Sequence, residues 1–392
     1  MSEEKNRSSL NQNTKVLHLG RNPSKQHGFV NPAIHRGSTV VFPTVHSLET
    51  ADQEFIYGRK GTPTVRGLET ALAELEGGYK SFLTPSGLAA ITASLLAFVE
   101  AGDHILIADS VYLPTRRFCS KVLTKLGVET TYYDPLIGSD IKSLIRDNTK
   151  LVFVEAPGSQ TFEMQDIPAI AKEAHEKGLL VLMDNTWGTP LYYKAFEHGV
   201  DVSIHAATKY IVGHADAMLG VITASKETAD RIQSMHEDLG LCPGPEDAYL
   251  GLRGLRTLSV RLKQHWKSGL EIAEWFQSRP EVSRVLHPAL PSDPGYELWK
   301  RDFTGAAGLF SLILNPVSKS KVDAFLNALS LFGMGWSWGG YESLVIPFNP
   351  AGYRTATKWN SEGPALRFHI GLDEPVDLIA DLEQAFSKAE MV

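Results

Sequence analysis

The chain has 392 residues, of which 43% are hydrophobic and 21% charged, the composition of a soluble globular protein large enough to form two domains. Its net charge of −7 argues against a general affinity for nucleic acid. Its two cysteines, Cys119 and Cys242, fit a reducing compartment as unpaired thiols. The polar N-terminus shows no apolar signal-like run, and the apolar stretch 88–99 is too short to span a bilayer, so we expect a cytoplasmic protein without membrane contact.

The chain divides into three zones by pattern. Residues 1–60 are rich in Asn, Ser, Gly and Pro, and we interpret them as an extended N-terminal arm. Between 61 and 255, short apolar runs alternate with helical stretches, which predicts an α/β domain with a mostly parallel sheet covered on both faces. Residues 256–392 predict a smaller α+β domain. The expected strands are 80–84, 104–108, 129–133, 150–156, 179–184, 201–207, 217–225, 308–314 and 366–372, and the expected helices are 86–99, 114–126, 166–177, 257–278, 318–331 and 375–389.

Two of the expected strand ends carry residues suited to a ligand, because open α/β sheets bind ligands at the carboxyl ends of their strands. In "LTPSGLAAI" (83–91), the backbone amides of Gly87 and Leu88 open a helix and form an anion site, although Ser-Gly turns also occur without any ligand. Tyr112 follows the next strand, where its ring either packs or faces a planar ligand.

A third strand end and the segment after it add an acid and an amine. In "LLVLMDNTW" (179–187), an apolar run leads directly into Asp184. An acid at such a position is seldom part of a hydrophobic core. Its carboxylate is suited to bind a protonated ring nitrogen. Lys209 follows within "AATKYIVGHADAM" (206–218), among small residues that leave room for a bound molecule. One βα unit separates the two, so both side chains can face one pocket.

These groups suit pyridoxal phosphate, which needs a lysine, a carboxylate, an aromatic ring and an anion site. No G-x-G-x-x-G or P-loop motif opens any expected helix, which argues against a dinucleotide or nucleoside triphosphate. The histidines are scattered, and neither H-E-x-x-H nor a paired C-x-x-C occurs, so we expect no metal site.

Longer motifs are spread over the chain from about residue 12 to the C-terminus, namely "YGRKGTPT" (57–64), "ELEGG" (74–78), "DPLIG" (134–138), "MDNTW" (183–187), "AATKYIVGHADAM" (206–218), "RGLRTLSVRLKQH" (253–265), "WKRDFTGAAGLFS" (299–311) and "SWGGYESL" (337–344). Together they resemble the Cys/Met-metabolism pyridoxal-phosphate enzymes. The resemblance implies an aspartate-aminotransferase-like large domain of fold type I and a smaller C-terminal domain. It also implies a homotetramer in which each N-terminal arm contributes to the active site of a neighbouring subunit.

The resemblance assigns roles to individual residues in cofactor binding, catalysis and substrate binding. Lys209 would be the Schiff-base lysine that also moves the Cα proton. Asp184 would pair with the pyridine nitrogen, and Tyr112 would stack on the ring and assist catalysis. The phosphate would lie near Gly87, Leu88 and Thr208, with Tyr57 and Arg59 added from a neighbouring subunit. Arg367 would bind the substrate carboxylate, aided by Ser337, Trp338 and Tyr57.

Within the family, the resemblance is to the branch that cleaves L-cystathionine by β-elimination, giving homocysteine, pyruvate and ammonia in methionine biosynthesis. Ala206 and Ser159 replace a serine and an asparagine found in many relatives, and both replacements are typical of this branch. The serine lost at 206 would remove one phosphate-binding hydroxyl. A γ-acting lyase or synthase, a racemase side activity and a non-catalytic small-molecule-binding protein of the same fold remain alternatives.

Two further segments also allow a purely structural interpretation. Trp336 and Trp338 either pack in the core or shape a loop at the site. The basic segment 253–265 is expected to face solvent or another subunit.

Overall fold

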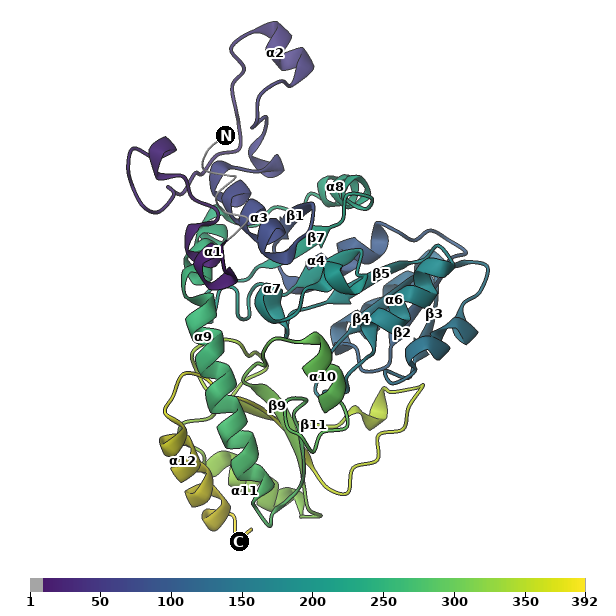
Figure 1. Cartoon of the computed structure of the whole chain (residues 1–392), viewed down its shortest axis with the longest axis vertical. Helices are drawn as coiled ribbons and strands as arrows, with labels where there is room; N and C mark the ends of the chain where they lie inside the picture. Colours follow the sequence, from purple (N-terminus) through teal and green to yellow (C-terminus); the bar gives the residue numbers. More distant parts are fainter. Residues whose placement is uncertain (1–9, 392) are drawn as a thin grey trace.

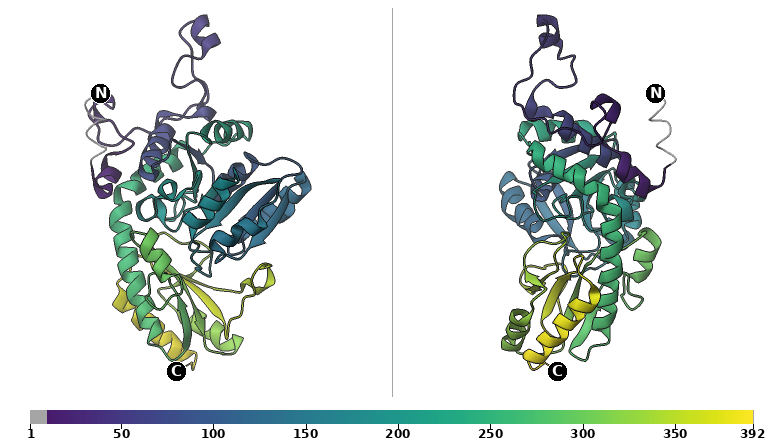
Figure 2. Two further views of the ribbon diagram at one scale, coloured as in Figure 1. Left: turned by 45° about the vertical axis from the view of Figure 1, so that its right-hand side comes forward. Right: turned by 90° about the vertical axis from the view of Figure 1, so that its left-hand side faces the viewer.

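The computed structural model describes residues 10–391 (Figure 1). Residues 1–9, which belong to the polar segment that shows no signal-like run, lie outside the described residues. A seven-stranded sheet and a five-stranded sheet form two layered units, and the long helix α9 (Pro245–Gln277) runs beside both (Figures 1 and 2). Within residues 10–391, no helix is long and apolar enough to cross a membrane.

The larger sheet has the strand order β1-β7-β6-β5-β4-β2-β3. All neighbouring strands pair in parallel except β7, which is antiparallel to both β1 and β6, so the predicted mostly parallel sheet is confirmed. The strands are β1 (Lys80–Thr84), β2 (His104–Ala108), β3 (Glu129–Tyr133), β4 (Thr149–Glu155), β5 (Leu180–Asp184), β6 (Val202–His205) and β7 (Gly220–Ala224).

Alternating strand residues divide the core of the larger domain between the two faces of its sheet. Val152 and Val154 pack on one face and Leu151 and Phe153 on the other, as the two-residue period of a strand requires. Because helices cover both faces, these runs are apolar throughout rather than alternating. The first face is covered by α3 (Pro63–Glu76) and α6 (Ile167–Glu176), and the second by α4 (Gly87–Leu96), α5 (Leu113–Phe118) and α8 (Ala229–Asp238).

The smaller sheet has the order β10-β11-β12-β9-β8 and is mainly antiparallel. Its core combines leucines with a cluster of phenylalanines, including Phe276 from α9 and Phe368, whose ring centroids lie 5.0 Å apart. β8, β10 and β11 were not among the expected strands. The elements are β8 (Val282–Leu286), β9 (Leu309–Leu314), β10 (Gly333–Met334), β11 (Leu344–Phe348) and β12 (Ala365–His369), with helices α10 (Tyr296–Asp302), α11 (Lys319–Ala328) and α12 (Pro375–Lys388).

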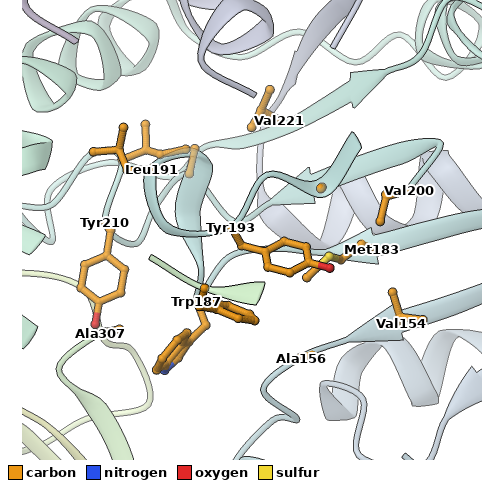
Figure 3. Packing of buried hydrophobic residues seen from close by; sticks show 14 of the residues in the cluster. Val154, Ala156, Met183, Trp187, Leu191, Tyr193, Val200, Tyr210, Val221 and Ala307 are labelled. Atoms are coloured by element: carbon orange, nitrogen blue, oxygen red, sulfur yellow. The ribbon is translucent and has the colours of Figure 1, made fainter. Parts of the chain in front are cut away.

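Aromatic side chains occupy the contact between the two units. Trp187 and Tyr210 lie beside the end of the larger sheet, near α7 (Thr189–Tyr192) (Figure 3). The Trp187 indole N–H donates to the carbonyl of Leu309 in β9 at 3.1 Å, and the Tyr210 hydroxyl accepts from the Gly308 N–H at 3.2 Å. These two hydrogen bonds therefore join loops at the edge of the larger sheet to the start of β9 in the smaller one.

The N-terminal segment differs from the extended arm that its composition predicts. Helix α1 (Gln12–His18) packs on α9, burying Val16, and Arg256 of α9 donates to the carbonyls of Val16 and Leu19. Beyond it, the chain projects away from the core and carries α2 (Val45–Thr50) at its tip (Figure 2). Only the part that follows α1 is exposed as expected of an arm, because most of its apolar side chains are not buried against their own chain.

Helix α9 begins at Pro245, twelve residues before the predicted start, and runs through position 255, where the sequence pattern changes. The expectation that its basic segment is wholly solvated or subunit-facing is wrong for Arg261. This side chain is buried and donates to the carbonyls of Tyr210, at 2.8 Å, and Gly254. No sequence pattern predicts that Arg261 is buried, because its backbone partners are recognisable only in the folded chain.

Candidate active site

The strand ends that carry the predicted residues lie along one edge of the larger sheet. β1, β2, β4, β5 and β6 run in the same direction, so their carboxyl ends meet there. Gly87 and Tyr112 follow β1 and β2, Asp184 ends β5, and Lys209 follows β6. Among residues 10–391, no cluster of three or more His, Cys, Asp or Glu side chains is arranged to hold a metal ion.

Asp184 is 9% exposed and is held by one neighbour. Its Oδ1 accepts hydrogen bonds from the Thr186 N–H, at 3.0 Å, and from the Thr186 hydroxyl, at 2.5 Å. Burial raises the pKa of Asp184, and the Thr186 hydrogen bonds oppose that rise. Thr186 Oγ1 also accepts from the Ala206 N–H at 2.9 Å and so joins the strand end to the Lys209 turn. The sequence analysis missed Thr186, although it lies within the quoted "MDNTW" motif.

The Lys209 amine lies in a half-buried, polar setting. Its Nζ donates to Ser337 Oγ at 2.8 Å and lies 5.2 Å from the centre of the Trp338 ring. Burial and the positive charge of Arg367 lower the pKa of Lys209 to about 8, against the opposing charges of Asp184 and Glu342. About a tenth of the amine is therefore neutral at pH 7 and about half at pH 8, and the neutral form is the one that acts as a nucleophile or base.

The smaller domain contributes Ser337, Trp338 and Arg367. Arg367 lies in β12, and its Nη2 donates to the carbonyls of Gly335, at 3.3 Å, and Ser337, at 3.0 Å. Its Nε is buried and has no partner among the described residues. Burial lowers the pKa of Arg367 to about 10, which leaves the side chain charged at neutral pH. Trp336, by contrast, is 84% exposed, so it does not pack in the core.

The predicted anion site is formed where α4 approaches the Lys209 turn. A side chain at Gly87 would place its Cβ 2.5 Å from that of Ala206, so glycine permits this close approach. Ser86 caps the helix by accepting the Ala89 N–H. The Thr208 hydroxyl is already engaged, since it accepts from the Leu219 N–H and donates to the Leu219 carbonyl. Leu88 is partly exposed beside Gly87.

Tyr112 is partly exposed and is anchored through its backbone. Its N–H donates to the Glu155 carboxylate at 2.7 Å, and Glu155 is the register partner of Asp184 on the neighbouring strand. Burial, together with the charge of Asp184, raises the pKa of Glu155 well above its usual value. Two adjacent acids in one buried site favour a proton on Glu155 and a charge on Asp184. The sequence analysis missed Glu155, although this acid also ends an apolar strand.

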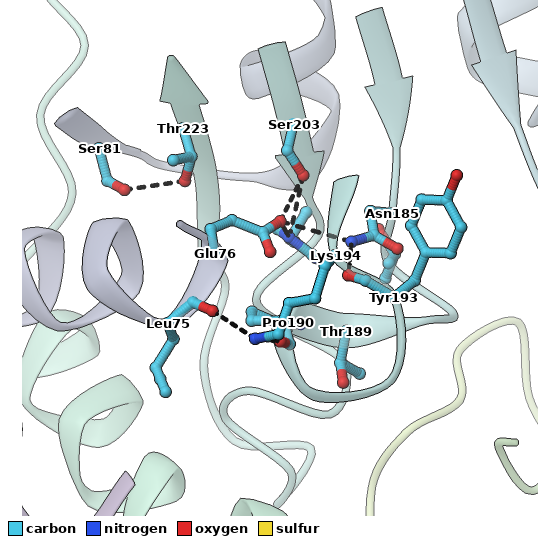
Figure 4. Close-up of polar contacts among 12 residues, drawn as sticks. Leu75, Glu76, Ser81, Asn185, Thr189, Pro190, Tyr193, Lys194, Ser203 and Thr223 are labelled. Carbon is cyan, nitrogen blue, oxygen red and sulfur yellow. Dashed lines mark hydrogen bonds and ion pairs between the residues drawn. The ribbon is translucent and has the colours of Figure 1, made fainter. Parts of the chain in front are cut away.

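A buried polar network braces the sheet beside Asp184 (Figure 4). One oxygen of Glu76, on α3, accepts hydrogen bonds from Ser203, His205 and Asn185. Burial alone would raise the pKa of Glu76, but the charge and hydrogen bond of His205 lower it below its usual value. Glu76 therefore stays ionised and ties the residue after β5 to the neighbouring strand β6.

Tyr57 and Arg59 are not brought together with the other predicted residues within one chain. Arg59 Nη1 donates to the carbonyl of Glu237, at the end of α8, and Lys60 forms an ion pair with the Glu237 carboxylate at 2.7 Å. Tyr57 and Arg59 line a groove of about 730 Å³ whose other walls include Leu241 and Cys242. Lys209, Asp184 and Arg367 are not among its lining residues.

The sequence of residues 13–387 matches the family described as "Cys/Met metabolism PLP-dependent enzyme". The chain belongs to this family. Its cofactor is pyridoxal 5′-phosphate. The chain is 50% identical to a "Putative cystathionine beta-lyase" of Rhizobium johnstonii, covering 97% of each chain, and 44% identical to "Cystathionine beta-lyase MetC" of Escherichia coli, covering 96% of this chain and 98% of that one. The crystal structure of metB from Corynebacterium glutamicum superposes with a TM-score of 0.88 at 32% identity, covering 97% of this chain and 98% of that one, in agreement with fold type I.

The residues present fit this cofactor of the family. Both hydrogen bonds to Asp184 end on Oδ1, which leaves Oδ2 available to a pyridine nitrogen. The Lys209 amine is partly neutral, and the first amides of α4 point out of a capped helix start. An acid, an amine and an anion site are the donor and acceptor groups that pyridoxal phosphate requires.

Proposed function

We propose that the chain catalyses the β-elimination of L-cystathionine to homocysteine, pyruvate and ammonia. It is a carbon–sulfur lyase. The observation that carries the substrate assignment is the similarity, over nearly the whole chain, to relatives named as cystathionine β-lyases. The geometry supports the chemistry, because a base and an acid for the pyridine nitrogen at the edge of the larger sheet lie near a carboxylate-binding arginine of the smaller domain.

Six residues of the larger domain and two of the arm would hold the cofactor. Lys209 would bind it covalently, and Asp184 Oδ2 would bind its ring nitrogen. When bound, pyridoxal phosphate supplies an electron sink for the negative charge that develops at the substrate Cα. The remaining residues are Tyr112 at the ring face, Gly87, Leu88 and Thr208 beside the phosphate, and Tyr57 and Arg59 from a neighbouring subunit.

Lys209 would move the protons of the reaction. Its pKa of about 8 places the amine near the optimum for a general base that later acts as an acid. Ser337 Oγ accepts a hydrogen bond from Nζ and so orients the amine toward the substrate. Lys209 would take the Cα proton and deliver it to the departing sulfur of homocysteine. The half-buried position of the amine limits the access of water that would compete for the proton.

Arg367 would fix the substrate. Nη2 is held by two backbone carbonyls, which leaves the other N–H groups of the guanidinium to bind an α-carboxylate through charge-assisted hydrogen bonds. Because Nη2 is held by the carbonyls of Gly335 and Ser337, the same contacts position the guanidinium and the loop that carries Ser337 and Trp338. Trp338 would line the substrate side of the site, within reach of the Lys209 amine.

The cellular setting belongs to the same proposal. The activity would serve methionine biosynthesis in the cytoplasm. The subunits would form a homotetramer of two dimers, each dimer with two shared active sites. The exposed apolar side chains of the arm, such as Phe29 at 72% and Val41 at 82%, support burial against another subunit.

Analysis of the keto acid released from L-cystathionine tests the proposed function. Cleavage of the Cβ–S bond gives pyruvate, and cleavage of the Cγ–S bond gives 2-oxobutyrate. We expect pyruvate and an equal amount of homocysteine from the purified enzyme. Mostly 2-oxobutyrate would contradict β-elimination and leave the cofactor and fold unaffected. Absence of both keto acids would contradict the lyase activity itself.

A further inference from the structure

Two fully buried histidines lie behind the Lys209–Ser337 contact and take no part in the proposed chemistry. His265 comes from α9, and His369 is the last residue of β12. Their ring centroids are 5.3 Å apart, and both rings pack on Tyr210, which follows Lys209 in the chain. A buried imidazole needs partners for its polar atoms, so the tautomer of each ring has structural consequences.

The backbone partners fix the two tautomers. His265 Nδ1 lies 2.9 Å from the carbonyl of Ile370, which can only accept, so Nδ1 carries the proton and Nε2 is an acceptor. His369 Nε2 lies 3.0 Å from the N–H of Gly339, which can only donate, so Nε2 accepts and the proton is on Nδ1. The Gly340 carbonyl, 3.2 Å from the same Nε2, is then left without a hydrogen bond from this ring.

The two remaining nitrogens complement each other. His265 Nε2 is an acceptor and His369 Nδ1–H is a donor, and both are buried without a partner among the described residues. The ring spacing allows a direct hydrogen bond after a small rotation, or one bridging water. The opposite tautomer of His369 would leave both imidazole lone pairs without donors and also orphan the Gly339 N–H, which is the costlier arrangement.

Protonation does not disturb this arrangement near neutral pH. Burial lowers the pKa of His265 to about 4 and that of His369 well below its usual value. The charged groups nearest to the pair, Arg261, Arg367 and Lys209, are all cations and oppose protonation further. Both rings are therefore neutral, as the two tautomers require.

We propose that His369, whose tautomer is set by the Gly339 N–H and complemented by that of His265, is a positioning residue that fixes the loop of residues 337–340 against Lys209. Gly339 has a φ of +84°, and a Cβ there would lie 2.9 Å from the backbone of Lys209, so this glycine contacts the lysine turn directly. Ser337, two residues earlier, accepts the hydrogen bond of the Lys209 amine. The chain of contacts from Ile370 through His265 and His369 to Gly339 thus ends at the base of the reaction. Its effect on turnover rests on the proposed function, whereas the tautomers do not.

Neutron diffraction from crystals of the deuterium-exchanged holoenzyme at pH 7 tests the tautomers directly. We expect deuterium on Nδ1 of both His265 and His369 and none on His369 Nε2. Deuterium on His369 Nε2, directed at the Gly340 carbonyl, would overturn the proposal. This measurement uses the unaltered protein, so it decides the matter even if a variant does not fold.

Variants of His369 test the link to Lys209. His369→Leu removes the acceptor for Gly339, and we expect kcat for L-cystathionine to fall about tenfold with little change in KM, since one buried hydrogen bond is lost. His369→Gln retains a carbonyl acceptor at the Nε2 position and should recover most of that loss. The matched control is His287→Leu, because His287 is also fully buried but packs on Phe310 of the smaller core.

The outcomes separate the two proposals. Equal loss in the Gln and Leu variants, or the same kcat loss in the His287 control, would contradict a positioning role for His369. An enzyme with the expected tautomers but no keto acid from L-cystathionine would contradict the proposed function and leave the histidine pair intact.

Discussion

The two halves of the candidate active site are built in opposite ways. In the half that carries Lys209, Asp184 and Arg367, the acid and the arginine are buried and the lysine is half-buried, and each side chain is held by contacts within its own chain. The half that carries Tyr57 and Arg59 lies on a projecting segment, with Tyr57 45% exposed. The first half is fixed by folding alone, whereas under our proposal the second would have its final surroundings only when another chain packs against it.

The exposed half is nevertheless held in place by contacts within its own chain. The cation of Arg59 lies 6.0 Å from the Tyr57 ring, and Glu237 binds Arg59 through its carbonyl and Lys60 through its carboxylate. Helix α8 therefore presents the segment at a defined place before any subunit contact forms. We predict that changes in the buried half remove the chemistry, and that loss of Arg59 from the exposed half disables the site that we propose is assembled between chains.

Removal of the Lys209 amine is expected to have the largest effect. Lys209→Ala should fold but lose covalent cofactor binding and turnover by about 10⁴-fold or more, because base and attachment point disappear together. Pyruvate release and circular dichroism measure the two properties. Lys226→Ala, at an exposed lysine of the same domain, is the matched control and should retain full activity. Ordinary pyruvate production by the Lys209 variant would refute its role.

Loss of the Arg367 guanidinium should act mainly on substrate binding. A charge-assisted hydrogen bond contributes about 1.5–3 kcal/mol, so Arg367→Leu should raise KM for L-cystathionine by roughly 10- to 150-fold. Arg367→Lys keeps the charge but not the fork and should lie between the two. Steady-state kinetics measure the effect. An unchanged KM in Arg367→Leu would mean that the α-carboxylate binds elsewhere.

The pH dependence of cofactor uptake gives a smaller but sharper test of the buried half. With a pKa lowered to about 8, the neutral fraction of the Lys209 amine should rise roughly fivefold between pH 7 and pH 8 and level off above pH 9. The rate at which the apoenzyme takes up pyridoxal phosphate, followed by absorbance, should rise over the same interval. A rate that still climbs steeply above pH 10 would indicate an ordinary, solvated lysine.

The sequence predicts the buried half well because its signals are local. The predicted strands 80–84, 104–108 and 129–133 coincide with β1, β2 and β3. These short runs are bounded by turn residues, which favours a strand over a helix. Asp184 was recognisable because a carboxylate directly after such a run is unusual. The early start of α9 was missed because its first turns carry glycines and acids that lack a clear helical period.

Other parts of the site depend on contacts that no local pattern encodes. Glu155, His265 and His369 form the contacts that matter here with residues far away in sequence. No local sequence pattern distinguishes them from residues without such contacts. The strands β8, β10 and β11 were overlooked because they are short or carry proline and polar residues. The roles of Tyr57 and Arg59 came from the family resemblance alone, and they remain a prediction.

Subunit mixing tests most directly whether the active site is assembled from two chains. Arg59→Ala and Lys209→Ala subunits, each inactive by itself, are unfolded together, refolded and checked for exchange by tag-based isolation of mixed assemblies. A mixed dimer holds one site with both Lys209 and Arg59 intact, so we predict recovery of about a quarter of the unaltered activity in a random mixture. Verified mixed assemblies that release no pyruvate would contradict a site shared between chains.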